Sequence, residues 1–155
     1  MLTTHKISAD FYDDNFQLIA IHCGLEDYAM GYAINFICGL RLKRMKSDLE
    51  LNQSLSFSMF EWEDGLSDNY WTLIANKCAI MEIMPSSGLF ENSTSSIRTD
   101  YLIKEKREVD YFLKVDAGCE LIIDSYVELI NKIPSVITAY QVNAQTLKSK
   151  RNLIF

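Results

Sequence analysis

The chain lacks the residue patterns on which the most familiar catalytic and cofactor sites are built. Gly-x-Gly-x-x-Gly, phosphate-loop, His-Glu-x-x-His and Gly-x-Ser-x-Gly patterns do not occur, which disfavours common nucleotide-binding and hydrolase chemistry. Only two histidines are present, and the four cysteines never form a Cys-x-x-Cys pair. The cysteines therefore indicate small buried side chains in a reducing compartment, without a zinc or disulfide framework. We predict no cofactor, no metal site and no catalytic residue.

Long apolar runs and an excess of positive charge are also missing. No segment approaches the roughly 20 apolar residues that span a bilayer. Residues 1–6 show no basic stretch followed by an apolar block, so we expect no secretory signal and a cytoplasmic location. The formal net charge is -6. Because nucleic-acid binding depends on Lys and Arg that neutralise phosphates, a nucleic-acid partner is disfavoured.

The composition is that of an ordinary globular domain. Hydrophobic residues make up 48% and charged residues 23% of 155 residues. A chain of this size typically buries about 68–70% of the surface that its unfolded form exposes, which is enough for a core without metal or disulfide support. We therefore expect one domain over residues 1–155.

A strand and a helix are predicted near the amino terminus. The apolar run at 16–22 predicts a strand, and the pattern at 25–38 predicts a helix that Gly39 ends. Apolar residues that recur every four positions, and their neighbours, predict one broad buried face: Tyr28, Tyr32, Phe36 and Leu40, with Ala29, Ala33 and Ile37.

The middle of the chain has the two-residue period of half-buried strands. Leu55, Phe57 and Met59 alternate with serines. The apolar segments 71–75 and 78–84, separated by a polar pair at 76–77, predict a hairpin.

The second half of the chain predicts a loop, extended chain, a helix and a last strand. The serine-rich stretch 85–99 predicts the longest loop, and 101–115 predicts extended chain with a turn near 105–107. The helix at 118–133 has an apolar stripe of Cys119, Ile122, Ile123, Tyr126, Ile130 and Ile133. The strand at 135–142 is apolar on both faces, which predicts an interior position in the sheet. The fold class is therefore α+β: a mostly antiparallel sheet of about six to eight strands with two amphipathic helices packed on one face.

A charged segment, Ile-Lys-Glu-Lys-Arg-Glu-Val-Asp-Tyr at 103–111, carries a family resemblance. Ile103, Glu105, Val109, Asp110 and Tyr111 match the pattern that names the bacterial IPExxxVDY family, and the segment resembles that family. A lysine at 104 stands where the family has proline, so the turn is expected to be looser here. The resemblance implies an uncharacterised cytoplasmic protein and no particular reaction.

Two groups of polar residues are candidate binding sites. In the charged segment, two interpretations are open for Glu105, Asp110, Tyr111 and Lys114. They form either a rim that binds a polar partner or part of a hairpin whose charges pair across its strands and keep its edge from aggregating. The second interpretation is favoured. His22 and Glu26 form the other group, at a strand-to-helix turn. A histidine satisfied by the helix start is favoured over a general base there.

The apolar end of the tail 148–155 also has two interpretations. It docks either on the chain's own sheet, which is favoured, or on a partner subunit.

These observations favour a non-catalytic interaction or adaptor module whose partner is an unknown protein or a second copy of the chain. The alternative is a domain that binds a small apolar molecule or lipid in a cavity between sheet and helix, lined by residues such as Phe57, Trp71 and Tyr140.

Overall fold

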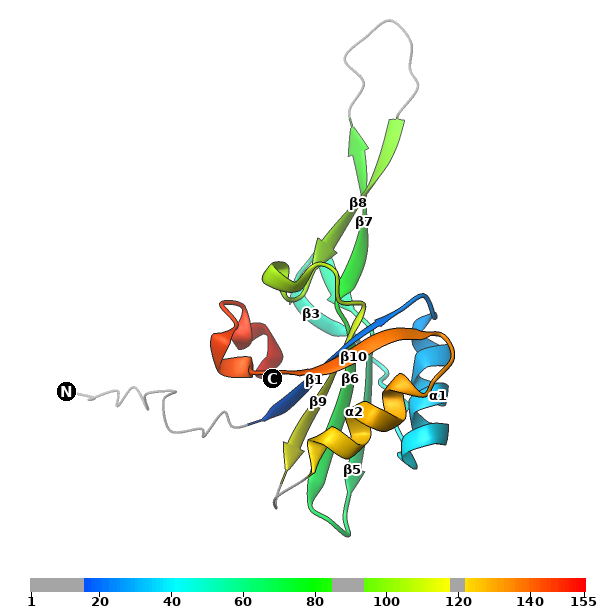
Figure 1. The fold of residues 1–155 in the computed structure, drawn as a ribbon. Coiled ribbons are helices and arrows are strands. Elements are labelled where there is room, and N and C mark those ends of the chain that lie inside the picture. The colour runs from blue at the N-terminus through cyan, green and yellow to red at the C-terminus, as the bar shows by residue number, and fades with distance from the viewer. Residues whose placement is uncertain (1–15, 85–93, 118–121) are drawn as a thin grey trace, which may run out of the picture.

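The computed structural model describes residues 16–84, 94–117 and 122–155. Its main element is a six-stranded antiparallel sheet in the order β10-β1-β9-β6-β5-β2, drawn in Figure 1. Its strands are β1 (Gln17–Cys23), β2 (Lys43–Arg44), β5 (Met59–Asp64), β6 (Asn69–Ala75), β9 (Tyr111–Ala117) and β10 (Val136–Val142). Two further antiparallel pairs are β3 (Leu49–Asn52) with β4 (Leu55–Phe57), and β7 (Lys77–Met84) with β8 (Thr94–Tyr101).

Two helices cover one face of the sheet. Helix α1 (Asp27–Cys38) and helix α2 (Ile123–Asn131) contribute Met30, Ile34 and Ile130 to a core that also contains Trp71 and other inward-facing strand residues. The prediction of an α+β fold with a mostly antiparallel sheet is confirmed. Among the described residues, no helix combines the length and the apolar character needed to cross a bilayer.

The opposite face of the sheet carries a second core. It is covered by β3 and β4, by the 3₁₀ helix η2 (Lys104–Lys106) and by the 3₁₀ helices η3 (Ala144–Thr146) and η4 (Lys150–Leu153). Phe57, Leu102 and Ile103 are fully buried there, and so is Leu153 in the tail. In this structure the tail therefore packs on the chain's own sheet through Leu153, while Ile154 and Phe155 remain partly exposed.

Helix α1 buries only part of the predicted face: Leu40 is buried and Ala33 and Ile37 pack against the core, but the three aromatic residues do not. Tyr28, Tyr32 and Phe36 are 70%, 72% and 78% exposed. The helix is apolar on nearly every side, so periodicity did not identify the buried face. Gly31 lies on the buried face, where a Cβ atom would lie 3.3 Å from the ring of Phe60, tighter than ordinary van der Waals contact, so glycine there favours close approach of the helix to the sheet. The prediction that Gly39 ends the helix is confirmed, with φ at 69°.

Three other predictions about the strands are wrong. Strand β6 pairs with β5 and β9, not with the segment 78–84, which pairs with β8. Residues 94–99 of the predicted loop belong to β8, and 85–93 lie outside the described residues. Strand β10 is at the edge of the sheet, and Ile137 on its outer face is 81% exposed. The predicted helix at 118–133 is observed in its central part as α2; Ile122 of the predicted buried stripe precedes the helix and is 74% exposed, and 118–121, with Cys119, lie outside the described residues.

Candidate functional site: a projecting hairpin and its base

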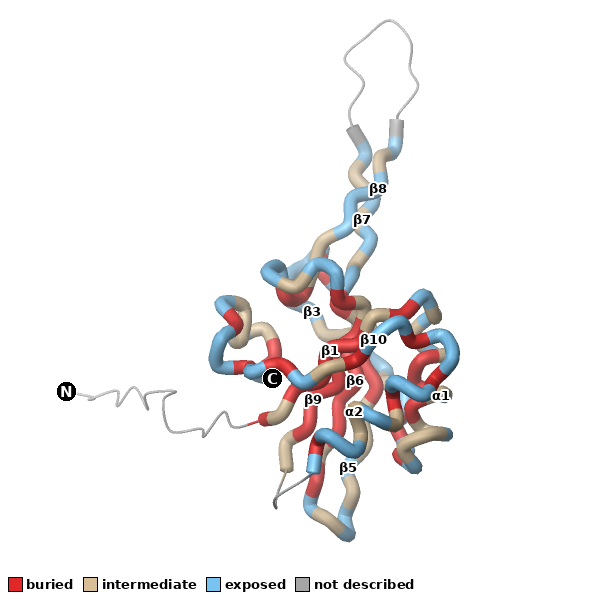
Figure 2. Tube along the Cα trace, viewed as in Figure 1, coloured by how far each residue is buried: buried red, intermediate tan, exposed pale blue. Residues whose placement is uncertain are grey.

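The hairpin β7–β8, called here the arm, extends away from the body of the molecule (Figure 1). Its two strands pair continuously from Lys77 opposite Tyr101 to Met84 opposite Thr94. Figure 2 shows that burial is concentrated in the body and that the described part of the arm is largely exposed beyond its base. Only Cys78 and Ile80, near the base, pack against the core. The arm is therefore a paired β-ribbon with both broad faces accessible over most of its length.

The two faces of the arm differ in chemistry. Because side chains alternate along a strand, Met81 and Ile83 share one face with Ile97, which lies opposite Met81. These three side chains are 68%, 72% and 73% exposed. On the other face, Arg98 forms ion pairs with Glu82 (3.0 Å) and Asp100 (3.8 Å). The arm thus presents an apolar face backed by a charged one.

The base of the arm is fixed by Asn76, the residue between β6 and β7. Its side chain is fully buried. The amide Nδ2 donates hydrogen bonds to the carbonyl oxygens of Lys106 (2.7 Å) and Val109 (2.9 Å). The Oδ1 atom accepts one from the backbone N–H of Ile103 (2.8 Å). One side chain therefore holds the turn at 103–109 in place, and that turn follows directly after β8.

Asp110 and Tyr111 complete this attachment. The carboxylate of Asp110 accepts a hydrogen bond from the backbone N–H of Cys23 (2.9 Å) and pairs with Lys77 at the start of the arm (2.5 Å). The hydroxyl of Tyr111 donates to the carbonyl oxygen of Leu25 (2.7 Å). Burial, and then the nearby acidic groups, raise the pKa of Tyr111. A pocket of about 220 Å³ lies at this end of the sheet, bounded in part by these groups.

Glu105 joins the same turn to the carboxyl-terminal tail. Its carboxylate accepts hydrogen bonds from the backbone N–H (2.8 Å) and the hydroxyl (2.7 Å) of Ser149. Partial burial works to raise the pKa of Glu105, but the hydrogen bonds from Ser149 outweigh it and hold the pKa below its ordinary value. In this structure Glu105, Asp110 and Tyr111 are thus engaged in internal contacts around the base of the arm.

The other three predicted site residues, Lys114, His22 and Glu26, form no hydrogen bond to Asn76, Glu105 or Asp110 in the described structure. Lys114 is 6% exposed, forms an ion pair with Asp116 (3.1 Å), and lies under the ring of Phe155 at 4.8 Å. His22 lies beside Tyr140, with 3.2 Å between Nε2 and the tyrosine hydroxyl. Glu26 precedes α1, and its side chain makes no capping hydrogen bond to that helix. Within the part of the chain that the structure describes, no hydrogen bond joins His22 to Glu26, and the Glu26 charge instead helps to raise the pKa of Tyr111.

A second apolar surface is the outer face of α1. Tyr28, Tyr32 and Phe36 are separated by one helical turn each, and the rings of Tyr32 and Phe36 stack with centroids 6.4 Å apart. We call these three residues the α1 stripe. Neither the arm's apolar face nor the α1 stripe was identified from the sequence as a surface, because apolar residues at strand or helix spacing predict burial.

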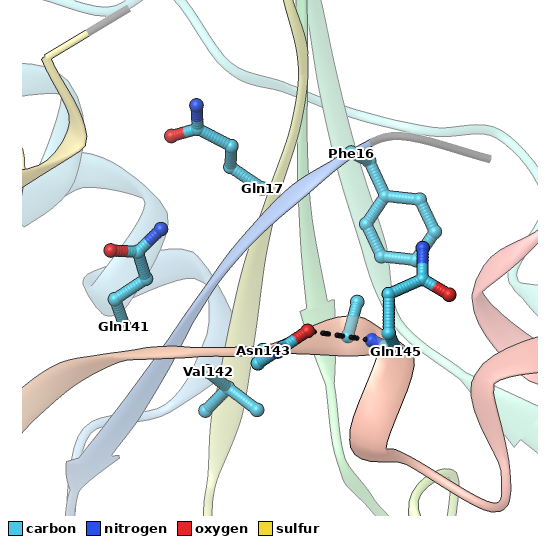
Figure 3. A pocket seen from close by; sticks show the side chains of 7 residues that line it. Phe16, Gln17, Gln141, Val142, Asn143 and Gln145 are labelled. Carbon is cyan, nitrogen blue, oxygen red and sulfur yellow. Dashed lines mark hydrogen bonds between the residues drawn. The ribbon is translucent and has the colours of Figure 1, made fainter. Parts of the chain in front are cut away.

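A pocket of about 450 Å³ lies where β1 begins and β10 ends (Figure 3). It is lined by Phe16, Gln17, Gln141, Val142, Asn143, Ala144 and Gln145. The Asn143 Oδ1 atom accepts a hydrogen bond from the Gln145 backbone N–H (3.0 Å). None of these seven side chains titrates, so the pocket provides hydrogen-bonding groups without an acid, base or nucleophile.

Cysteine and metal chemistry find little support in the geometry. Burial raises the pKa of the Cys23 thiol, and it raises that of Cys38 to about 11, so both thiols are protonated at neutral pH. Within residues 16–84, 94–117 and 122–155, no three His, Cys, Asp or Glu side chains are placed to hold a metal ion. The residues named for an apolar cavity also do not gather, since Phe57 and Trp71 belong to cores on opposite faces of the sheet.

The sequence matches no protein-family model, and no curated protein or solved structure gives a significant match.

Proposed function

We propose that this chain is a protein-interaction module that associates with a second copy of itself, the arm of each copy lying across the α1 stripe of the other. The observation that carries the proposal is the arm, on which Met81, Ile83 and Ile97 are each about 70% exposed on one face of a projecting ribbon. Exposed apolar patches of this kind commonly mark interaction surfaces in soluble proteins.

The size of the two apolar surfaces favours their joint use. The arm's three apolar side chains expose on the order of 400 Å², and the α1 stripe exposes a similar area. A stable interface takes roughly 800 Å² from each partner. A dimer in which the two arms contact each other would therefore bury about half of that area on each copy. A dimer in which each arm covers the partner's α1 stripe contains two such contacts and buries all of it. A reciprocal contact of this type closes as a two-fold dimer.

The attachment of the arm supports the same arrangement. Asn76 and Asp110 fix the base by hydrogen bonds and an ion pair, so the ribbon loses less conformational freedom on binding than a free loop would. The charged face with Arg98, Glu82 and Asp100 keeps solvent contact while the apolar face is covered. The polar groups of the 103–111 segment act, on this proposal, as the support of a binding element and not as a catalytic centre.

The test is the mass of the protein in solution. Sedimentation equilibrium from about 1 to 500 µM is expected to show twice the monomer mass of 17.8 kDa at the upper end. The Ile97→Lys variant places a charge in the apolar face, and it is expected to weaken the dimer at least about tenfold.

Ser96→Lys is the matched control. It adds the same charge one residue away, on the opposite face of the same strand and across from Glu82, and is expected to leave the dimer intact. A wild-type protein that stays monomeric at 500 µM contradicts the proposal. Equal weakening by both lysine variants does so as well.

We also propose that the chain is a cytoplasmic member of the IPExxxVDY family. The five matching positions at 103, 105 and 109–111 support this, and so does their common location around the base of the arm. Cell fractionation with an antibody against the chain tests the location, and recovery in a membrane or secreted fraction would contradict it.

A further inference from the structure

A third pocket lies between the sheet and the helices, at the end of the sheet away from the arm. Its volume is about 240 Å³. It is lined by Cys38, Gly39, Leu40, Trp62, Asp64, Ser67, Asn69, Trp71 and Tyr126. These residues come from the end of α1, from the facing ends of β5 and β6 with their connecting turn, and from α2.

The wall of this pocket is rich in aromatic rings. Trp62 and Trp71 are directly opposite each other on β5 and β6. The ring of Tyr126 lies 4.8 Å from that of Trp71, tilted by 55°. Such rings offer an electron-rich surface that attracts organic cations. Trp62 and Trp71 are the only two tryptophans in the chain.

One buried polar atom in the lining lacks a partner. Asn69 is 4% exposed, and its Oδ1 atom accepts no hydrogen bond in the described structure. The hydrogen bonds of the neighbouring residues determine which terminal atom of the Asn69 amide is the oxygen and which is the nitrogen. The Asp64 carboxylate only accepts, so the Ser67 hydroxyl donates to it and in turn accepts from Asn69 Nδ2 (3.0 Å). The remaining Asn69 atom is therefore an unpaired acceptor enclosed in the wall of the pocket, and its partial negative charge adds to the negative potential of the lining.

The charge of the lining has one sign. The Ser67 hydroxyl and then the Leu66 backbone N–H hold the pKa of Asp64 below its ordinary value, with a further contribution from Arg41 outside the lining. Cys38 and Tyr126 have raised pKa values and remain neutral. The lining contains no Lys, Arg or His. At neutral pH it therefore carries one negative charge.

We propose that this pocket binds a small primary alkylammonium ion, with the alkyl chain against the rings of Trp62 and Tyr126 and the ammonium group beside the Asp64 carboxylate. The volume is below the roughly 300–1,000 Å³ of sites for drug-sized molecules, which restricts the ligand to a small amine. The argument for this site does not rest on the arm or on the proposed dimer.

Tryptophan fluorescence measures binding directly, because both tryptophans line the pocket. Three probes of the same chain length separate the contributions: n-butylammonium, n-butanol and butyrate, each titrated at constant ionic strength. Butylammonium is expected to give a saturable change with an affinity about tenfold higher than that of butanol, and butyrate is expected to give none.

Asp64→Asn and Glu63→Gln form the matched pair of variants. Asp64→Asn keeps an oxygen that accepts from Ser67 but removes the charge, and it is expected to weaken butylammonium about fivefold. Glu63→Gln removes the same charge from the adjacent residue, which points to the other face of β5, and is expected to change the affinity less than about twofold. Thermal unfolding confirms that both variants fold. Equal affinities for butylammonium and butanol, a wild-type titration that does not saturate, or equal effects of the two variants would each overturn the proposal.

Discussion

Asn76 is the residue on which the position of the arm depends most, and its replacement gives the sharpest prediction. Its side chain is fully buried and makes three hydrogen bonds, two to carbonyl oxygens and one from a backbone N–H. Asn76→Ala removes all three and leaves two buried backbone groups unpaired, the Val109 carbonyl and the Ile103 N–H, while the Lys106 carbonyl still accepts from the Val109 N–H (3.1 Å). Each such group costs about 1–3 kcal/mol, so we expect the free energy of unfolding to fall by about 4 kcal/mol.

The assay is urea unfolding followed by tryptophan fluorescence. A loss of about 4 kcal/mol corresponds to a midpoint lowered by roughly 2 M urea. Asn152→Ala is the control, because Asn152 makes one hydrogen bond, to the carbonyl oxygen of Leu102 (2.7 Å), in a partly buried place. That variant is expected to lose about 1 kcal/mol. If the two variants differ by less than about 1 kcal/mol, Asn76 does not hold the turn in the way described.

Three further predictions concern pH and packing. The pKa of Glu105 is lowered in the folded protein, so its carboxylate stabilises the fold above the ordinary Glu range, and this stabilisation is lost as the pH falls through the folded pKa. The stability difference between wild type and Glu105→Gln should therefore shrink between roughly pH 5 and pH 3. A difference that stays constant over this range would contradict the prediction. Burial and the hydrogen bond to Glu61 raise the pKa of Tyr70 to about 12. In an ultraviolet titration of tyrosine ionisation, Tyr70→Phe should therefore remove a step near pH 12. Loss of a step near pH 10 instead would refute the assignment. Gly31→Leu should destabilise the fold by about 2 kcal/mol through overpacking against Phe60, and unchanged thermal stability would show that α1 does not pack by this face.

The parts of the fold that follow from local periodicity were predicted from the sequence. Leu55, Phe57 and Met59 are buried and Ser56 between them is exposed, because a strand with one face on a core alternates with a period of two. Pro134 and Gly39 lie just beyond the ends of the helices for reasons that are equally local.

The features that were not predicted depend on contacts between residues far apart in the sequence. Asn76 has the look of a turn residue between two apolar runs, but its partners lie about 30 residues further along the chain. Glu105 is satisfied by Ser149, 44 residues away. No local pattern reports such contacts, so the charged segment was interpreted as a laddered hairpin or a binding rim instead of the base of the arm.

The exposed apolar surfaces were missed for a different reason. Met81 and Ile83 alternate as buried strand residues do, and Tyr28, Tyr32 and Phe36 recur as buried helix residues do. A period identifies residues that share a face, but it does not say what covers that face. Glycine at position 31 was the available signal for α1, since a small residue on one side of an apolar helix indicates close approach there.

The proposed dimer, in which each arm lies across the partner's α1 stripe, is tested most directly with two variants of opposite charge, one in the arm and one in the stripe. The variants Ile97→Lys, in the arm, and Tyr32→Glu, in the α1 stripe, are each expected to be mainly monomeric at the lowest concentration at which the wild type is fully dimeric. Mixed in equal amounts, they can form a dimer in which one arm–helix contact is native and the other pairs a lysine with a glutamate. We predict that sedimentation of the mixture shows the dimer mass. A mixture that remains monomeric, or variants that are dimeric when alone, would contradict the arm-to-helix arrangement.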